Sequence, residues 1–184
     1  EIAGSGNLGF GVRPPAAAGC GIDDDAVMML DNERDRAVFL ASRHSLPENY
    51  LEAAKQRGAF TIMTDALVPP PQFRPFMAFT HGVLREAGMD YLAFGHIGDC
   101  HIHFSILPQA DQVEQGAALY DRIVARAAEL GGVYSGEHGT GKRKRRDFLL
   151  CHGRRGADEV RRCKAAVDPA FLFNRGNVIE APGM

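Results

Sequence analysis

YLAFGHIGDCHIHFS, residues Tyr91–Ser105, places two runs of strand-forming residues on either side of a Gly98-Asp99 turn. Apolar, aromatic and β-branched runs that flank such a turn are typical of a β-hairpin. We therefore predict antiparallel strands over residues 90–96 and 101–107. The rest of the sequence can be arranged around this hairpin.

The strand after the turn alternates polar and apolar side chains. A period of two places the polar residues on one face of a sheet and the apolar residues on the other. One face is therefore expected to pack on a core, while the opposite face presents imidazoles. The apolar set is Ile102, Phe104 and Ile106, and the polar set is His101, His103 and Ser105.

Periodicity also predicts the elements elsewhere in the chain. Its middle has the order strand, helix, strand, strand, helix, strand, which is typical of a split βαβ, ferredoxin-like plait. We expect an α+β fold in which an antiparallel sheet carries helices on one face. The predicted helices cover 31–57 with a break near 45–47, 76–87 after a rigid run of prolines, 110–130 and 157–166, and the remaining strands cover 26–30, 59–63 and 133–134.

The composition is that of a soluble globular protein, with 45% hydrophobic and 24% charged residues among 184. A net charge of −2 argues against general affinity for nucleic acid. No apolar run approaches the roughly 20 residues of a membrane span. The four cysteines show no C-x-x-C spacing, so we expect free thiols in a reducing, cytoplasmic environment.

Residues 1–25 are rich in Gly, Ala, Pro and Asp and are expected to form a flexible tail, with the domain itself over 26–184. Gly4, Gly6 and Gly9 match the letters of a dinucleotide-binding GxGxxG motif. Too few residues precede them to form the required strand, and Pro14-Pro15 block the required helix start. The glycines therefore indicate a loop.

A second stretch, SGEHGTG at Ser135–Gly141, places Glu137 and His138 on a glycine-rich loop. Two histidines and one carboxylate can hold a divalent metal ion and leave a position open for a substrate. His96, His103 and Glu137 are therefore candidates for a metal site, although the spacing alone does not choose among the three histidines of the hairpin. Imidazole and carboxylate favour Zn, Mn or Fe, whereas Ca or Mg would prefer more oxygen ligands.

Five basic residues in a row, Lys142–Arg146, follow this loop. They favour a solvated helix start beside an anion-attracting site, because contact with nucleic acid or a membrane surface needs more than one such patch. The letters from Gly136 to Lys142 also come close to a phosphate-binding P-loop. Arg143 stands where that motif requires Ser or Thr for Mg²⁺, so nucleotide binding by a P-loop is not expected.

These stretches also carry a resemblance to a known family. GHIGDCHIHF (95–104) resembles the GH-x-GDGN-x-H motif of the FAD-linked oxidases of the D-lactate dehydrogenase, glycolate oxidase and D-2-hydroxyglutarate dehydrogenase group, and SGEHGTG resembles the SGEHGIG segment of that family. DALVP (65–69) resembles its D-x-x-VP element, and KAAVDPAFLFNRGNV (164–178) resembles its K-x-x-x-DP-x-x-x-LNPGK terminus. The motifs follow one another in the family order.

The resemblance implies a role for each matching residue. His96, His103 and Glu137 match the positions that ligate the metal in metal-dependent members. His138 matches the histidine that acts as a base on the substrate hydroxyl. Looser matches by position are Arg43 for clamping the substrate carboxylate, Ser105 for contacting the substrate and Asn174 for contacting the flavin.

Two departures from the family lie inside the hairpin motif. Cys100 stands where the family usually has Gly, and His101 stands where it has Asn. His101 and His103 share a face and compete as ligands, and Cys100 adds a thiolate option, so the spacing leaves the ligand set open. Met63 stands where members that oxidise hydroxyglutarate carry a Lys for a second carboxylate, which favours a monocarboxylate or a substrate with an uncharged tail.

The function implied is the C-terminal, substrate- and metal-binding domain of an FAD-dependent D-2-hydroxy-acid dehydrogenase. A D-lactate-like substrate would become the 2-oxo acid, with its hydride passed to the flavin. FAD is expected to be bound mainly by another domain of the same protein, so the chain alone is expected to be inactive. Two alternatives stay open, a metal-binding module without oxidase activity and a metal-dependent hydrolase. A homodimer is one option for the assembly.

Overall fold

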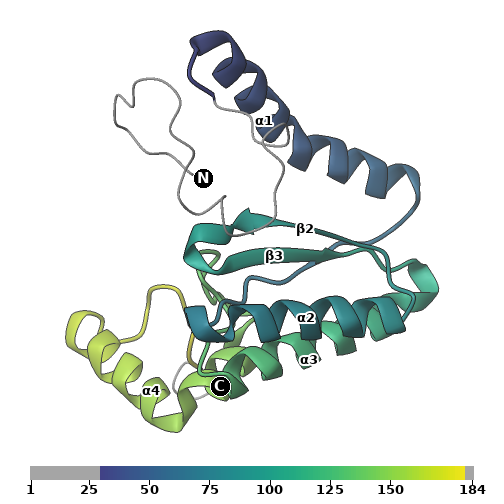
Figure 1. The fold of residues 1–184 in the computed structure, drawn as a ribbon. Helices are drawn as coiled ribbons and strands as arrows, with labels where there is room; N and C mark the ends of the chain where they lie inside the picture. The colour runs from purple at the N-terminus through teal and green to yellow at the C-terminus, as the bar shows by residue number, and fades with distance from the viewer. Residues whose placement is uncertain (1–29, 181–184) are drawn as a thin grey trace. The chain divides into compact units, whose positions relative to one another are not determined.

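The computed structural model describes residues 30–180, except the side chains of residues 46, 47 and 53. These residues belong to two compact units, one from Arg57 onward and one that ends at Gln56, and each is described by itself (Figure 1). The expected tail (1–25) lies outside the described residues. So does the expected strand at 26–30 apart from Leu30, which is not in a strand.

The described part of the first unit contains one helix, α1 (Glu33–Gln56). Asn32 caps its start, because the Asn32 side-chain oxygen accepts a hydrogen bond from the Asp35 backbone N–H at 2.9 Å. The predicted break near residues 45–47 is wrong, because the backbone stays helical there. The Ser45 hydroxyl bonds back to the Ser42 carbonyl at 2.9 Å, which satisfies the side chain within the helix.

The second unit is built on a three-stranded antiparallel sheet in the order β1-β3-β2. Its centre is the predicted hairpin of β2 (Tyr91–His96) and β3 (His101–Ile106), in which His96 pairs with His101. The turn is a short 3-10 helix that ends at Cys100, a residue with a left-handed φ of 54°. The hairpin prediction is confirmed.

β1 (Ile62–Met63) pairs with the other edge of β3 and is shorter than the predicted strand at 59–63. The predicted strand at 133–134 forms one isolated bridge instead, between Val133 and Leu67. The antiparallel sheet with its helices confirms the α+β class, with three strands formed in the described unit.

Helices α2 (Pro70–Glu86) and α3 (Val113–Glu129) pack side by side against the sheet (Figure 1). α2 begins at Pro70 rather than at the predicted residue 76. Prolines fit the first positions of a helix, where a missing backbone N–H costs no hydrogen bond. α3 follows a short 3-10 turn, and together they match the predicted helix at 110–130.

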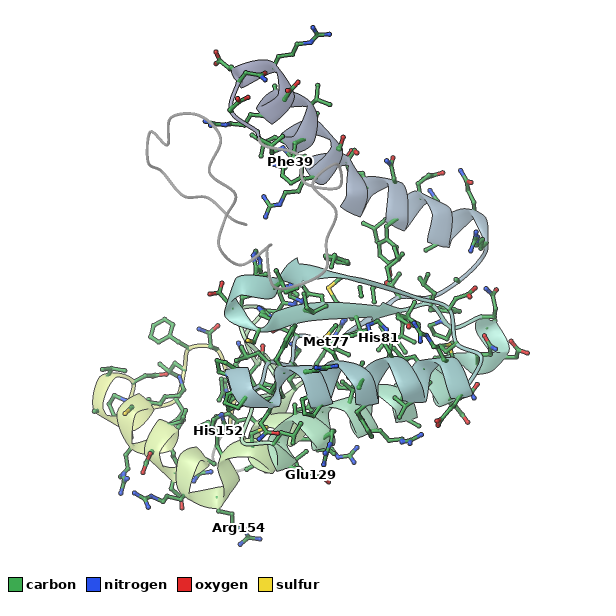
Figure 2. The ribbon with its side chains drawn as sticks, viewed as in Figure 1. Phe39, Met77, His81, Glu129, His152 and Arg154 are labelled. Atoms are coloured by element: carbon green, nitrogen blue, oxygen red, sulfur yellow. The ribbon has the colours of Figure 1, made fainter. Side chains whose placement is uncertain are left out.

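The apolar face of β3 packs on these two helices. Phe104 and Ile106 are fully buried, together with Leu84 of α2 and Ile123 of α3. His81 of α2 also lies on this side, with its ring edge-on to Phe104 at 5.1 Å between centroids (Figure 2). The predicted core face of the strand is confirmed.

The opposite face of β3 is also covered, which the alternation did not predict. His101, His103 and Ser105 are each at most 5% exposed. The SGEHGTG loop lies over this face, because the His138 ring stacks on His103 at 4.9 Å between centroids and Gly136 lies directly against the His101 ring. The segment that follows β1 runs along the edge of β3, where Leu67 forms bridges with both His101 and Val133. The imidazoles are therefore buried beneath this loop rather than presented on an open sheet face.

α4 (Arg145–Val167) is longer than the predicted helix at 157–166. It bends at Gly153, where φ is 63° and ψ is −171°. This left-handed conformation favours glycine, which has no Cβ to clash with the backbone. Phe148 and Ala157, one from each arm of the bent helix, pack together in a second apolar cluster.

Within residues 30–180 no helix is both long and apolar enough to cross a bilayer. The cysteines in this range, Cys100, Cys151 and Cys163, are free thiols. Cys20 lies outside the described residues.

Phe104→Ala should lower the free energy of unfolding by about 3–5 kcal/mol, because it removes a fully buried ring from the centre of the sheet and leaves a cavity. Leu92→Ala, on the same hairpin but 43% exposed, should cost about 1 kcal/mol or less. Urea unfolding of both variants measures the difference. Equal losses would contradict the placement of the two faces.

Candidate active site

A buried carboxylate, Asp65, lies at the centre of the candidate site. It lies just after β1, where the chain runs along the edge of β3, and it has no exposed surface. Its oxygens accept hydrogen bonds from His101 Nε2 at 3.0 Å, the His138 backbone N–H at 2.9 Å, Lys144 Nζ at 3.3 Å and the Ser135 hydroxyl. Asp65 thereby connects strand β3, the SGEHGTG loop and the basic run.

The surroundings of Asp65 keep its carboxyl ionised. Burial alone would raise the pKa, but hydrogen bonds from Ser135 and from the His138 N–H, with the positive charge of Lys144, outweigh burial and lower the pKa to about 2. A buried charge without such donors would be very unfavourable. The site is therefore built around a fixed negative charge.

His103 lies beside His101 on the same face of β3. Its Nδ1 faces the backbone carbonyl of Thr64 at 3.3 Å, and its Nε2 faces Glu137 Oε1 at 2.9 Å. A carbonyl oxygen can only accept, so Nδ1 carries the proton in this arrangement. Nε2 and the carboxylate oxygen are then two acceptors in contact, and they require a positive species between them, either a second proton or a metal ion.

His96 and His138 extend this arrangement around the Glu137 carboxylate. His96 Nε2 lies 3.8 Å from Glu137 Oε2, and His138 Nε2 lies 3.6 Å from Glu137 Oε1. Spacings of this size suit neighbouring ligands of one ion at roughly 2 Å per bond. The side chains of His96, His138 and Glu137 are 36%, 42% and 45% exposed, so this part of the site is open to a small molecule.

The structure also offers a second set of ligands. Ligand atoms of Asp65, His103, Glu137 and His138 all lie within 4.8 Å of one another. Asp65 is the weakest candidate of this set, because its oxygens already accept the hydrogen bonds that satisfy its buried charge. His103 and Glu137 belong to both sets, and the choice lies between His96 and His138 as the additional ligand.

His101 and Cys100, the residues that depart from the family motif, take different places. The His101 ring directs Nε2 at Asp65, and it contacts the His103 ring edge-on at 4.5 Å between centroids. Cys100 occupies the left-handed position of the turn. Neither belongs to the group of close ligand atoms found among the described residues. The geometry favours His101 as a support of the site.

The remaining predicted site residues lie in three separate places. Arg43 is an exposed residue of α1, in the first unit, and its role stays a prediction. Ser105 is fully buried and pairs with both Met63 and Leu92 in the sheet, which disfavours direct contact with a substrate. Asn174 is exposed with a φ of 45°, and its contact with a flavin stays a prediction.

The loop that carries Asn174 is held by an ion pair. Lys164 Nζ bonds Asp168 at 2.8 Å and the Phe173 carbonyl at 2.7 Å. The Asp168 carboxylate also accepts the backbone N–H groups of Leu172 and Phe173, both at 3.0 Å. The K-x-x-x-DP spacing therefore has a structural role, and the loop presents Leu172 and Phe173 to the exterior at 66% and 71% exposure.

The sequence did not identify Asp65 or Lys144 as parts of the site. Asp65 was visible only as the first residue of the DALVP element. Lys144 belongs to a basic run that was predicted to be solvated, but its side chain is only 18% exposed and bonds Asp65. No local pattern signals either contact, because the partners lie 79 residues apart.

Asp65→Asn should destabilise the chain by about 2–4 kcal/mol, because the amide cannot balance the charge of Lys144 and turns donor hydrogens toward other donors. Urea unfolding at pH 7 measures the change. Glu129→Gln, which breaks an exposed ion pair with Arg126 on α3, is the matched control and should change stability by about 0.5 kcal/mol or less. A variant Asp65→Asn as stable as the control would contradict the anchoring role.

The Asp65 carboxylate also predicts how the stability of the chain depends on pH in the acid range. The folded-state pKa of about 2 lies below the ordinary 3.8, so the stabilisation is complete above about pH 4 and is lost as the pH falls toward 2. The shift corresponds to about 2 kcal/mol. The stability gap between the wild type and Asp65→Asn should therefore narrow between pH 5 and pH 2.5, and a constant gap would argue against an ionised Asp65.

Comparisons with known proteins identify the family of the chain. The family of FAD linked oxidases, C-terminal domain, matches residues 16–178. The chain is 29% identical over 159 residues to the glycolate oxidase subunit GlcD of Bacillus subtilis (strain 168), a match that covers 85% of this chain and 33% of the relative. It is 30% identical over 161 residues to the mitochondrial D-lactate dehydrogenase (cytochrome) 1 of Saccharomyces cerevisiae, covering 86% and 26%.

A third relative, an uncharacterized FAD-linked oxidoreductase of Mycobacterium tuberculosis, is 36% identical over 126 residues, covering 68% of this chain and 27% of the relative. The chain thus spans about a third or less of the length of these relatives. The family match extends over most of the chain, from before α1 to beyond α4. The chain belongs to the family of FAD-linked oxidases and carries their C-terminal domain.

Proposed function

We propose that this chain is the substrate- and metal-binding part of an FAD-dependent dehydrogenase that oxidises a D-lactate-like 2-hydroxy acid to the 2-oxo acid. The observation that carries the proposal is the pair of His103 and Glu137, which face each other at 2.9 Å while the Thr64 carbonyl fixes the tautomer of the ring. That arrangement suits a cation at an open site. Membership of the FAD-linked oxidases supplies the redox chemistry.

The residues present suit a divalent metal ion. His103 Nε2 and Glu137 would bind it, with His96 as the third ligand, and imidazole with carboxylate favours Zn, then Mn or Fe. The contact from His103 Nδ1 to the Thr64 carbonyl is the kind that fixes the ring of a metal-binding histidine. Asp65 would hold the surrounding loop and stay outside the ligand set.

Residues of the chain would position the substrate and accept its proton. When bound, the metal would lower the pKa of the substrate hydroxyl and the flavin would accept the hydride. The ring nitrogens of His138 lie 3.7 Å from Asp65 and 3.6 Å from Glu137, too far for hydrogen bonds, so the exposed ring is available to take the hydroxyl proton. Arg43 would bind the substrate carboxylate, with Ser105 as a more distant contributor.

FAD would be held mainly by another domain of the same protein. The exposed Leu172 and Phe173, beside Asn174, are the surface on which we place that domain, because exposed large apolar side chains on a pinned loop suit a protein contact. We place the protein in the cytoplasm, with a homodimer as one possible assembly and no nucleic acid as a partner.

The alternatives use the same residues. A metal-binding module would hold an ion at His103 and Glu137 without flavin, and a metal-dependent hydrolase would use His138 to activate water. The full-length gene product separates them. Flavin absorbance that is bleached by D-lactate without oxygen supports the oxidoreductase, whereas stoichiometric metal without flavin supports one of the alternatives.

Metal analysis of variants tests the ligand set. The chain loaded with Zn²⁺ and desalted should keep one ion per chain in His101→Asn, because His101 is engaged by Asp65. His103→Ala should lose the ion, and His96→Ala should bind it more weakly. His152→Ala, an exposed histidine of α4 (Figure 2), is the control and should bind as the wild type does. If His101→Asn loses the metal and His103→Ala keeps it, the assignment is wrong.

Rapid mixing of the full-length protein with D-lactate tests the base. His138→Gln should slow flavin reduction by about 10²–10⁴-fold, the usual effect of losing a general base, while metal content stays unchanged. Flavin reduction at the wild-type rate would remove His138 from the mechanism. Loss of metal together with activity would instead identify His138 as a ligand.

A further inference from the structure

A hollow of about 470 Å³ lies at the bend of α4, well within the size range of small-ligand sites. Its sides come from the basic run, from both arms of the bent helix and from the segment Val178–Glu180. None of the candidate active-site residues lines it. It is a separate feature of the second unit.

The walls of this hollow are cationic. One carboxylate, Glu180, faces five basic side chains, namely Lys142, Arg143, Arg145, Arg146 and Arg161. Within the basic run, Lys144 alone bonds Asp65, whereas its four neighbours line the hollow.

The charges of the walls are only partly balanced. Arg146 bonds Asp121 at 2.9 Å and Arg161 bonds Asp158 at 2.5 Å, both on side chains outside the hollow. Lys142, Arg143 and Arg145 make no ion pair with any described residue. Like charges gathered in a concave site repel one another and focus a positive potential, which an anion would relieve.

The floor of the hollow is apolar and fixed. Ala157, Val178 and Ile179 line it and also belong to the second apolar cluster or pack against it. The backbone N–H of Val178 bonds the Gly141 carbonyl at 2.8 Å, which ties the terminal segment to the start of the basic run. Leu149 from the first arm completes the floor. Ala157 and Ile179 are only 7% and 5% exposed, so the apolar surface that a ligand can contact comes mainly from Leu149 and Val178.

We propose that this hollow binds a nucleoside diphosphate, with the two phosphoryl groups on the unpaired cations and the base on the apolar floor. Arginine forks match phosphate oxygens bidentately, and a lysine adds a point charge. The site does not use the P-loop letters, since Glu137 of that loop faces His103. The proposal is independent of the oxidoreductase function, because it involves neither the histidines nor a flavin.

Calorimetric titration of the 184-residue chain with ADP tests the proposal. ADP should bind once per chain and more weakly as salt is raised, since the contacts are charged. Inorganic pyrophosphate should bind more weakly than ADP, and adenosine alone should not bind measurably. Arg143→Ala, at an exposed position that carries no packing role, should weaken ADP binding about tenfold or more. Arg145→Ala should have the same effect.

Arg154→Ala is the matched control. Arg154 is an exposed arginine of the same helix (Figure 2), and it does not line the hollow, so its loss removes one charge without touching the site. ADP should bind this variant as it binds the wild type. The proposal is overturned if ADP does not bind, or if the three arginine variants weaken ADP binding equally. It is also overturned if pyrophosphate binds as tightly as ADP, because the apolar floor then contributes nothing to binding.

Discussion

The hydrogen bonds that converge on the buried Asp65 carboxylate hold together parts of the chain that are distant in sequence. His101 lies 36 residues away and the His138 N–H lies 73 residues away. A buried charge is tolerated only when most of its donors are in place, so the loop, the strand and Lys144 must assemble together. The cost of leaving this carboxylate unsatisfied is what fixes the position of the SGEHGTG loop.

The segment around Thr64 and Asp65, which continues β1 along the edge of β3, also determines the orientation of the His103 ring. Thr64 and Asp65 are adjacent, and they serve neighbouring histidines of β3: the Thr64 carbonyl receives His103 Nδ1, and Asp65 receives His101 Nε2. His103 is thereby turned so that Nε2 meets Glu137 from the loop that Asp65 anchors. Thr64 and Asp65 therefore position both His103 and the loop that carries Glu137, the two parts of the proposed metal site. Because Asp65 engages His101, this second buried histidine can lie beside His103 without binding the metal.

Local pattern was sufficient for the hairpin, for the apolar face of β3 and for the helix at 110–130, because each depends on periodicity within one element. The family motifs also placed His96, His103, Glu137 and His138 in one neighbourhood. The sequence pattern did not predict the features that depend on contacts between residues far apart in the chain. Alternation could not show that the SGEHGTG loop covers the polar face of β3, and composition could not separate Lys144 from its solvated neighbours. The bend at Gly153 was not predicted, because a single glycine inside a helical pattern is often tolerated without a bend.

The central claim is that Asp65 supports a cation site whose ligands are other side chains. Anomalous diffraction at the zinc edge from crystals of the Zn²⁺-loaded chain tests it most directly. The account predicts one anomalous peak roughly 2 Å from both His103 Nε2 and a Glu137 oxygen, with Asp65 still bonded to His101 and the His138 N–H. A peak ligated by Asp65, or a metal-loaded crystal with no peak between His103 and Glu137, would contradict it.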